Sequence, residues 1–333
     1  MINDEFYMNL ALQKAWEFQI LTYPNPAVGC VILDKNGALL ACEAHERAGE
    51  AHAELNAVKS ALFKLNPDFK FPNGSNELYE FILANHNGIL KGSKAYVTLE
   101  PCSHHGKTPP CANLLKVLGF SEVIIARRDE NKKASGGAEI LRGSSIKLKF
   151  DVLKDRADEL IEPFLSWQSG NFSFFKIALC ANGVATGGVI SNEQSRTHMH
   201  RLRSASDLLV IGGNTVRTDR PTLDIRLIKN GKNPDILIYS RTQNFDRTIP
   251  LFNVSGRIVE ISNSLEKAFK VPLVMFEGGE SFLNSLDERV SWVLIYQSSE
   301  FKNLQNLRAN LRLKRVFGSN FGSDNYGWYK IIK

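Results

Sequence analysis

The sequence predicts a two-domain α/β protein. Its 333 residues are long for one domain and comfortable for two. Short apolar runs of strand length alternate with segments that place apolar residues at helical spacing, which is typical of layered α/β structures. A break at Gly170-Asn171 separates two such series. We therefore expect one domain over residues 1–151, a linking helix within 152–171, and a second domain over 172–333.

In the first domain, each predicted element has a local signal. Asp4 can cap a helix, which Pro24-Asn25-Pro26 then stops. Lys35-Asn36-Gly37 is a turn signal between two strands. His52 opens a helix, whereas residues 66–92 indicate an insertion without a chemical role. The other elements predicted here are strands at 28–33 and 38–42, a weakly helical segment at 78–83, a strand at 95–99, a helix at 112–118, and strands at 122–126 and 146–150.

The second domain follows a linking helix predicted over Asp155–Trp167. It lacks the Gly-x-Gly-x-x-Gly pattern after a first strand, so a Rossmann domain is not supported. His198 and His200 fall on a predicted helix and are expected at the surface. The predicted elements are strands at 174–181, 208–212, 236–239, 257–261, 273–277, 292–296 and 329–332, and helices at 193–204 and directly after Gly278-Gly279.

Composition limits the class of protein. The formal charge is +6, but acidic and basic residues are interspersed, which argues against a polynucleotide-binding tail. This basic excess suits a phosphorylated small substrate as well as it suits an ordinary mixed surface. The cysteine count of five is odd and shows no disulfide spacing, so we expect a reducing, cytoplasmic setting. Residues 1–9 hold two acids and no basic region, so we expect no signal peptide there. No apolar run approaches the length of a membrane span.

Chemistry is concentrated in His52-Ala53-Glu54, Pro101-Cys102 and Pro110-Cys111. One imidazole and two thiolates give three protein ligands, and tetrahedral zinc with three protein ligands keeps a position open for water, as in catalytic sites. Glu54 is placed to act as a general acid and base. Together these residues form the signature of zinc nucleobase deaminases, with the usual Cys-x-x-Cys stretched to Cys102…Cys111.

Other classes need features that the sequence does not offer. A polynucleotide-editing deaminase would need a basic groove with stacking aromatic residues, and no such cluster accompanies the motif. A structural zinc module would need a fourth protein ligand. His104 and His105 are near enough in sequence to be considered, but solvated loop histidines are the simpler interpretation.

The N-terminal motifs resemble those of the bifunctional deaminase-reductase family of bacterial riboflavin biosynthesis, over residues 24–30, 45–54 and 98–111. The resemblance implies a cytidine-deaminase-like α/β/α layer domain. It also implies one Zn²⁺ per chain on His52, Cys102 and Cys111, with Glu54 as the catalytic proton shuttle. Asn25 and His45 become candidate substrate contacts. The implied reaction is hydrolytic deamination of 2,5-diamino-6-(5-phosphoribosylamino)pyrimidin-4-one.

The C-terminal half resembles the NADPH-dependent reductase of the same family, which has a dihydrofolate-reductase-like α/β fold. This half would reduce the ribosyl group of 5-amino-6-(5-phosphoribosylamino)uracil to ribityl. Arg203 and Arg226 would grip the substrate phosphate, because guanidinium groups match phosphate oxygens. The implied substrate contacts are Arg203, Leu223, Arg226 and Glu277, and the implied cofactor contacts are Ala178, Thr215, Asp219, Ser240, Gly278 and Gly279.

A departure from the family pattern at residues 180–189 leaves an alternative open. Cys180-Ala181-Asn182-Gly183 replaces Ser-Leu-Asp-Gly, and the following loop is short, with Gly187 and Val189 where the family has a Ser and a Trp. The C-terminal half could therefore be a degenerate domain that supports assembly beside an active deaminase. We expect a phosphorylated pyrimidine as ligand, a homo-oligomer formed through the reductase domain, and no nucleic-acid or membrane partner.

Overall fold

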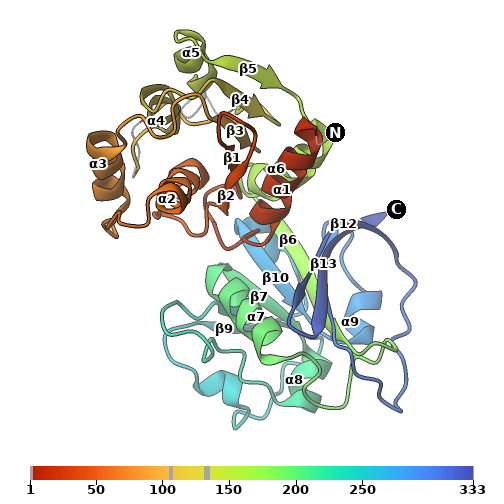
Figure 1. The fold of residues 1–333 in the computed structure, drawn as a ribbon. Helices are drawn as coiled ribbons and strands as arrows, with labels where there is room; N and C mark the ends of the chain where they lie inside the picture. The colour runs from red at the N-terminus through yellow and green to blue at the C-terminus, as the bar shows by residue number, and fades with distance from the viewer. Residues whose placement is uncertain (1–2, 105–107, 131–135, 333) are drawn as a thin grey trace. The chain divides into compact units, whose positions relative to one another are not determined.

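The computed structural model describes residues 3–104, 108–130 and 136–332. The chain divides into two compact units, residues 1–164 and 165–333, and each contains its own β-sheet (Figure 1). The division lies inside α6 (Lys154–Gln168), in the region predicted to link the domains. The prediction of two α/β domains is thus confirmed. No helix in the described part of the chain is long and apolar enough to cross a membrane.

The N-terminal unit is built on a five-stranded sheet in the order β2-β1-β3-β4-β5 among its described residues. β1 runs antiparallel to both β2 and β3, whereas β3, β4 and β5 are parallel. The predicted turn joins β1 to β2, with Gly37 at a φ of 90°. The strands are β1 (Gly29–Leu33), β2 (Leu39–Ala44), β3 (Lys94–Val97), β4 (Glu122–Ile125) and β5 (Lys147–Phe150).

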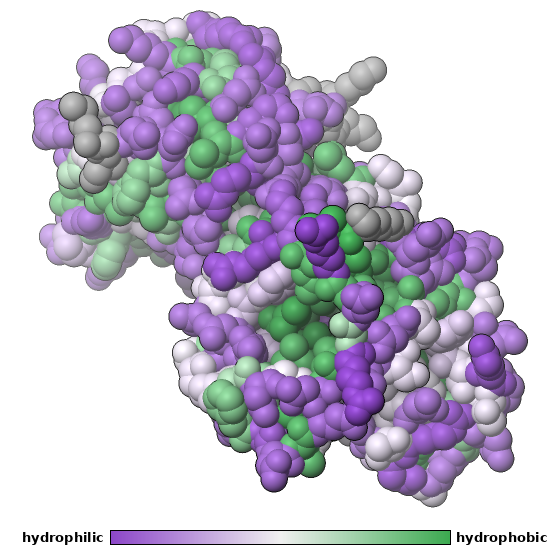
Figure 2. Space-filling model, turned by 90° about the vertical axis from the view of Figure 1, so that its right-hand side faces the viewer, coloured by the Kyte–Doolittle hydropathy of each residue, from purple (hydrophilic) through white to green (hydrophobic). Residues whose placement is uncertain are grey.

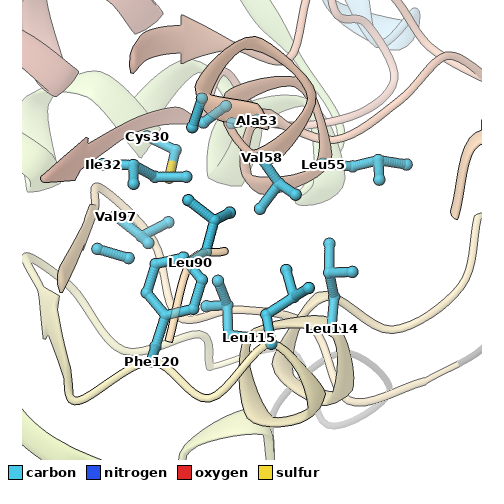
Figure 3. Close-up of a cluster of buried hydrophobic side chains, with 14 of the residues drawn as sticks. Cys30, Ile32, Ala53, Leu55, Val58, Leu90, Val97, Leu114, Leu115 and Phe120 are labelled. Carbon is cyan, nitrogen blue, oxygen red and sulfur yellow. The ribbon is translucent and has the colours of Figure 1, made fainter. Parts of the chain in front are cut away.

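Helices cover both faces of this sheet. Cys30 and Ile32 join the core with α2 and α4, as Figure 3 shows. Successive residues of a strand point to opposite faces, so Gly29 faces α1, where a Cβ would lie 2.0 Å from the carbonyl oxygen of Ala11. Helices therefore pack closely against both faces of the sheet. The helices are α1 (Asp4–Trp16), α2 (Ala53–Leu65), α3 (Ser75–Asn85), α4 (Cys111–Val117) and α5 (Gly137–Arg142).

One detail of the first helix differs from the prediction. Asn3, not Asp4, caps α1, since its side-chain oxygen accepts a hydrogen bond from the backbone N–H of Phe6. Asp4 instead accepts hydrogen bonds from Tyr96 and Lys149. These partners lie 92 and 145 residues away from Asp4 along the chain, so Asp4 makes long-range contacts in place of the predicted local cap.

The C-terminal unit contains an eight-stranded sheet in the order β12-β13-β11-β6-β10-β7-β8-β9. The strands from β11 to β9 are parallel, and β12 and β13 form an antiparallel hairpin at one edge. The strands are β6 (Phe172–Leu179), β7 (Leu208–Gly212), β8 (Asp235–Tyr239), β9 (Val259–Ser262), β10 (Leu273–Glu277), β11 (Trp292–Gln297), β12 (Arg312–Phe321) and β13 (Asp324–Ile332).

In this unit the sequence analysis missed mainly short helices and part of the hairpin. β12 and α8 were absent from the prediction, and β13 is longer than the predicted strand at 329–332. The helical elements are α7 (Glu193–Ala205), α8 (Gly213–Asp219), α9 (Glu280–Asn284) and the 3₁₀ turns η1 (Pro250–Asn253) and η2 (Ala268–Lys270).

The prediction that His198 and His200 lie at the surface is wrong, since both are buried on α7. His198 Nδ1 lies 2.6 Å from the hydroxyl of Tyr296, and burial lowers the pKa of His198 to about 3. α7 contains few aliphatic residues, so its histidines and Leu202 supply the face that packs inward. A polar-looking helix thus buries imidazoles in their neutral form.

Candidate metal centre and cofactor cavity

A candidate metal centre lies where two helices of the N-terminal unit begin. His52 is the N-cap of α2, Cys111 is the first residue of α4, and Cys102 follows β3. His52 Nδ1 lies 3.6 Å from Cys102 Sγ and 3.5 Å from Cys111 Sγ. Among the described residues, no fourth histidine, cysteine or carboxylate joins this group of three ligand atoms. One imidazole and two sulfurs fit zinc, with one coordination position left for another ligand.

The loop after β3 is fixed by buried polar groups. Thr98 Oγ1 accepts a hydrogen bond from the backbone N–H of Gly29 at 3.0 Å. The Glu100 carboxylate accepts from the N–H of Ala138 at 2.9 Å, which ties this loop to α5. Cys102 Sγ in turn accepts from the N–H of Cys111 at 3.4 Å. The two cysteines are therefore oriented by backbone as well as by each other.

The electrostatics of this site suit metal binding and proton transfer. Hydrogen bonding to Cys111 and to His52 lowers the pKa of Cys102 to about 4, so its thiolate is favoured. Glu54 is only 3% exposed in the first turn of α2. Burial, followed by the negative charge of Cys102, raises the pKa of Glu54 to about 7. A carboxyl group with a pKa near neutrality can both accept and return a proton.

The two residues of the N-terminal unit that were predicted to contact a substrate, Asn25 and His45, lie beside this centre. His45 Nε2 is 3.1 Å from Asn25 Nδ2, and His45 Nδ1 is 3.1 Å from the carbonyl oxygen of Ala51. Burial lowers the pKa of His45 to about 4, so the ring is neutral: Nδ1–H donates to Ala51 and Nε2 accepts from Asn25. The rings of His45 and His52 meet edge to face at 5.3 Å. His45 thus forms a fixed wall of the site.

The other ring nitrogen of His52 has its own partner. His52 Nε2 lies 3.0 Å from Thr108 Oγ1, and Thr108 is buried. Because Nδ1 faces the two sulfurs, Nε2 carries the hydrogen and donates it to the Thr108 hydroxyl. Such a partner fixes the tautomer and the ring orientation of a metal-ligating histidine.

The segment at 66–92 contacts the helix that begins with Cys111. Tyr79 on α3 is buried, and its hydroxyl donates to the carbonyl oxygen of Pro110 at 3.4 Å. The same hydroxyl accepts from Asn113 Nδ2 at 3.4 Å. The segment therefore has a packing role next to the metal centre, which the sequence analysis did not predict.

A cavity of about 1030 Å³ lies in the C-terminal unit, at the carboxyl ends of parallel strands. Ligands of open α/β sheets bind at this edge. The cavity brings together most of the residues predicted to bind substrate or cofactor in this half. The predicted residues that line it are Ala178, Arg203, Thr215, Asp219, Leu223, Ser240, Glu277, Gly278 and Gly279.

Three charged residues form a buried network at this cavity. Arg203 donates through Nε and Nη2 to the two carboxylate oxygens of Glu277, at 2.7 and 2.9 Å. Lys176 Nζ lies 3.5 Å from the same carboxylate. Burial opposes ionisation of Glu277, but the charges of Arg203 and Lys176 prevail and lower its pKa to about 2. Arg203 is thus already paired, and its contact with a phosphate stays a prediction.

Arg226 differs from the other predicted residues of this half. It does not line the cavity; its side chain is 61% exposed and donates to Asp224 at 2.8 Å.

The two glycines at the end of β10 differ in their surroundings. A Cβ added at Gly278 would lie 2.7 Å from Phe282, so this position is closely packed, whereas a Cβ at Gly279 would meet nothing within 4 Å. Gly279 therefore leaves backbone open at the end of β10.

Both units match families of known proteins. Residues 1–127 match the family model for the cytidine and deoxycytidylate deaminase zinc-binding region, and residues 180–291 match the RibD C-terminal domain. The chain is 33% identical over 233 residues to the riboflavin biosynthesis protein RibD of Escherichia coli (strain K12), which covers 68% of this chain and 56% of that protein. The chain belongs to the RibD family. RibD of Aquifex aeolicus is 34% identical over 239 residues, 69% of this chain and 60% of the relative.

These alignments span less than two thirds of the RibD proteins' own length. Solved structures agree over the full chain in fold. A diaminohydroxyphosphoribosylaminopyrimidine deaminase/5-amino-6-(5-phosphoribosylamino)uracil reductase from Thermotoga maritima is 24% identical, with a TM-score of 0.63 and 99% of both chains covered. RibD from Acinetobacter baumannii gives a TM-score of 0.60 at 24% identity, again with 99% of both chains covered. The predicted pair of folds is confirmed.

The sequence analysis named the three residues that the structure brings together as a candidate metal centre and most of the cavity lining, but it missed Thr108 and Tyr79. Thr108 lies inside the motif at residues 98–111, although nothing in the motif says which group its hydroxyl contacts. Tyr79 carries no sequence signal for its contact with Pro110. His104 is exposed, and His105 lies outside the described residues.

Replacing Thr108 with valine tests the role of its hydroxyl in this RibD-family site. Valine keeps the shape but cannot accept the His52 hydrogen bond. We expect zinc affinity to fall by about 10- to 100-fold, the usual scale for such partners. Competition with a chromogenic chelator measures this affinity directly. Thr98→Val would be a poor control, because it would remove the hydrogen bond that Thr98 accepts from the backbone of Gly29. The control is Thr248→Val, on the surface of the other unit, which should leave the zinc affinity unchanged.

Proposed function

We propose that the chain is a bifunctional enzyme of riboflavin biosynthesis. The N-terminal unit would deaminate 2,5-diamino-6-(5-phosphoribosylamino)pyrimidin-4-one by zinc-dependent hydrolysis. The C-terminal unit would then reduce the ribosyl group of 5-amino-6-(5-phosphoribosylamino)uracil with NADPH. The observation that carries this proposal is the convergence of His52, Cys102 and Cys111 beside buried Glu54, in a unit that matches the deaminase model.

In the deamination, His52, Cys102 and Cys111 would hold zinc. When bound, zinc supplies Lewis acidity that makes a water molecule nucleophilic near neutral pH. Glu54 takes a proton from the attacking water and returns it to the departing amine, which its pKa of about 7 permits in both directions. His45 and Asn25, held by each other and by Ala51, present a fixed polar edge to the pyrimidine.

In the reduction, the nicotinamide supplies the hydride, so the protein has to align donor and acceptor. The cavity is large enough for a drug-sized or larger ligand and is lined by backbone at Gly278 and Gly279. Thr215, Asp219 and Ser240 line the same cavity and supply polar contacts for the cofactor. Buried Glu277, held ionised by Arg203 and Lys176, fixes a charged network at the end of β10.

An assay of the purified protein separates this proposal from its alternative. The diamino-pyrimidinone ribosyl phosphate is supplied with and without NADPH, and both ammonia release and NADPH oxidation are followed. We expect ammonia in both cases and NADPH oxidation only after deamination. Ammonia release without any NADPH oxidation, at saturating cofactor, would select the deaminase with a degenerate reductase domain. No ammonia release from zinc-loaded protein would contradict the proposal itself.

Arg226→Ala tests the phosphate contact in the reductase. Arg226 is exposed and outside the cavity lining, and in this proposal it meets only the phosphate of a bound substrate. We expect the KM for the deaminated substrate to rise about tenfold, as for a lost charge-assisted hydrogen bond, with NADPH affinity unchanged. Steady-state kinetics and NADPH titration measure the two quantities. Arg312→Ala, an exposed arginine on β12, is the matched control. An unchanged KM would remove Arg226 from the substrate site.

We also propose that the chain forms a homo-oligomer through its C-terminal unit and acts in the cytoplasm. Figure 2 shows hydrophobic residues gathered on the face of the C-terminal unit that it presents. Exposed apolar patches of this kind mark interaction surfaces. Sedimentation velocity of the full chain checks this: a monomer at micromolar concentration would contradict it.

A further inference from the structure

One wall of the cavity is a short loop that contains two adjacent glycines. Residues 181–191, named here the wall loop, follow β6, and Gly188 and Val189 within it line the cavity. Gly187 and Gly188 both have positive φ, at 86° and 90°. Glycine loses more conformational freedom on ordering than any other residue. A wall built on two such residues needs external contacts to keep one shape.

Those contacts come from residues 298–307, named here the clasp segment. Two backbone hydrogen bonds join the segments: Ala181 N–H donates to the Glu300 carbonyl and Leu307 N–H donates to the Gly183 carbonyl, both at 2.8 Å. The Asn182 side chain adds a bond from its Nδ2 to the Lys302 carbonyl at 2.8 Å. These bonds fix the first part of the wall loop but not its glycines.

Lys302 reaches the glycines themselves. Its Nζ donates to the carbonyl oxygen of Gly187 at 2.9 Å and to that of Val189 at 3.2 Å. The two carbonyls flank Gly188, so one ammonium group bridges the most pliable part of the wall. Among the described residues, Lys302 forms no ion pair with a carboxylate. Its charge is therefore directed at backbone carbonyls, and hydrogen bonds to a charged donor are stronger than neutral ones.

Packing of the clasp segment supports the same arrangement. A Cβ added at Gly187 would lie 2.5 Å from Leu304 Cδ1, so Leu304 sits directly against the glycine backbone. Val184 and Asn306 form an isolated antiparallel bridge between the two segments. The clasp segment thus covers the outer side of the wall loop, while the inner side faces the cavity.

We propose that Lys302 is a positioning residue for the reductase: it holds the Gly187–Val189 wall in the shape that accepts the dinucleotide cofactor. This rests on the proposed reductase function. Hydride transfer requires the nicotinamide and the ribosyl carbon in contact, so a wall that moves disturbs both ligands. Without Lys302, only a fraction of molecules has the wall in place, and the apparent dissociation constant rises by the inverse of that fraction.

The test compares Lys302→Met with Lys302→Arg in the full chain, using NADPH as the probe. Methionine keeps the unbranched apolar part of the lysine side chain without a donor, whereas arginine keeps charge and donors. We expect the Kd for NADPH, measured by fluorescence titration, to rise about tenfold in K302M and to stay within about twofold in K302R. At saturating NADPH, kcat should stay near the wild-type value, because Lys302 lines no part of the cavity. Lys270→Met, a lysine outside the cavity lining, is the control.

The outcomes distinguish this inference from the function on which it rests. A wild-type protein that binds no NADPH overturns both. Wild-type binding with an unchanged Kd in folded K302M overturns the positioning role alone. If K302M does not fold, Lys302→Gln takes its place, since its shorter amide cannot bridge both carbonyls; an unchanged Kd then overturns the role equally. Ammonia release by the N-terminal unit should be unaffected in every folded variant, which shows that an effect is confined to the reductase.

Discussion

Replacement of Glu54 by glutamine is expected to leave the metal in place and to lower the rate of ammonia release by at least about a hundredfold. Glu54 is outside the group of three ligand atoms, so an amide at this position removes no metal bond. The amide has nearly the same shape but cannot take a proton from water or deliver one to the leaving amine. Because Glu54 is buried, bulk water cannot take over the proton transfer when the carboxyl group is replaced.

The measurements are kcat from ammonia release and metal content by elemental analysis on the same preparation. Glu50→Gln, an exposed residue close to the same helix, is the matched control and should behave as wild type. NADPH oxidation with the deaminated substrate should not change in E54Q, because we propose that reaction for the other unit. Near-normal ammonia release from folded, zinc-loaded E54Q would rule out Glu54 as the proton shuttle.

Cys111→Ser is expected to reduce bound zinc from one equivalent per chain to about a tenth or less, since zinc in such sites prefers thiolate to a neutral hydroxyl. Ammonia release should fall with it. Cys102→Ser should act in the same way, because the two sulfurs lie at nearly equal distances from His52 Nδ1.

Metal analysis after gel filtration measures this loss. Cys42→Ser is the matched control, since Cys42 is a free, half-buried thiol outside the group of ligand atoms. It should retain a full equivalent of zinc. A C111S or C102S protein that kept a full equivalent of tightly bound zinc would show that the metal is held elsewhere.

The candidate metal centre could be predicted from the sequence because it depends on residue types and local order. His52 precedes a helical pattern, and Pro110 precedes both Cys111 and another helical pattern, so these two candidate ligands were expected at helix starts. Positions 52 and 54 do not share a helix face, but His52 is the N-cap and Glu54 lies in the first turn of α2. The parallel strands likewise appeared as apolar runs.

What could not be predicted depends on contacts between distant segments. The pairing of Arg203 with Glu277 joins α7 to the end of β10, and no pattern in the sequence around either residue predicts it. His198 looks like a surface residue until Tyr296 is brought against it from β11. β12 was missed because its burial is irregular and its sequence carries Arg312, Lys314 and Arg315, which dilute any alternation of apolar and polar residues.

The position of β6 in its sheet has a consequence for how the chain is made. β6 is the first strand of the C-terminal unit, yet its two neighbours are among the last: Phe172 pairs with Leu273 and Phe174 pairs with Trp292. Long-range parallel pairing forms slowly, because a large loop must close before any contact is gained. On the ribosome, the N-terminal unit can therefore complete its sheet while β6, with buried Phe172, Phe174 and Phe175, waits unpaired for most of the remaining chain to emerge.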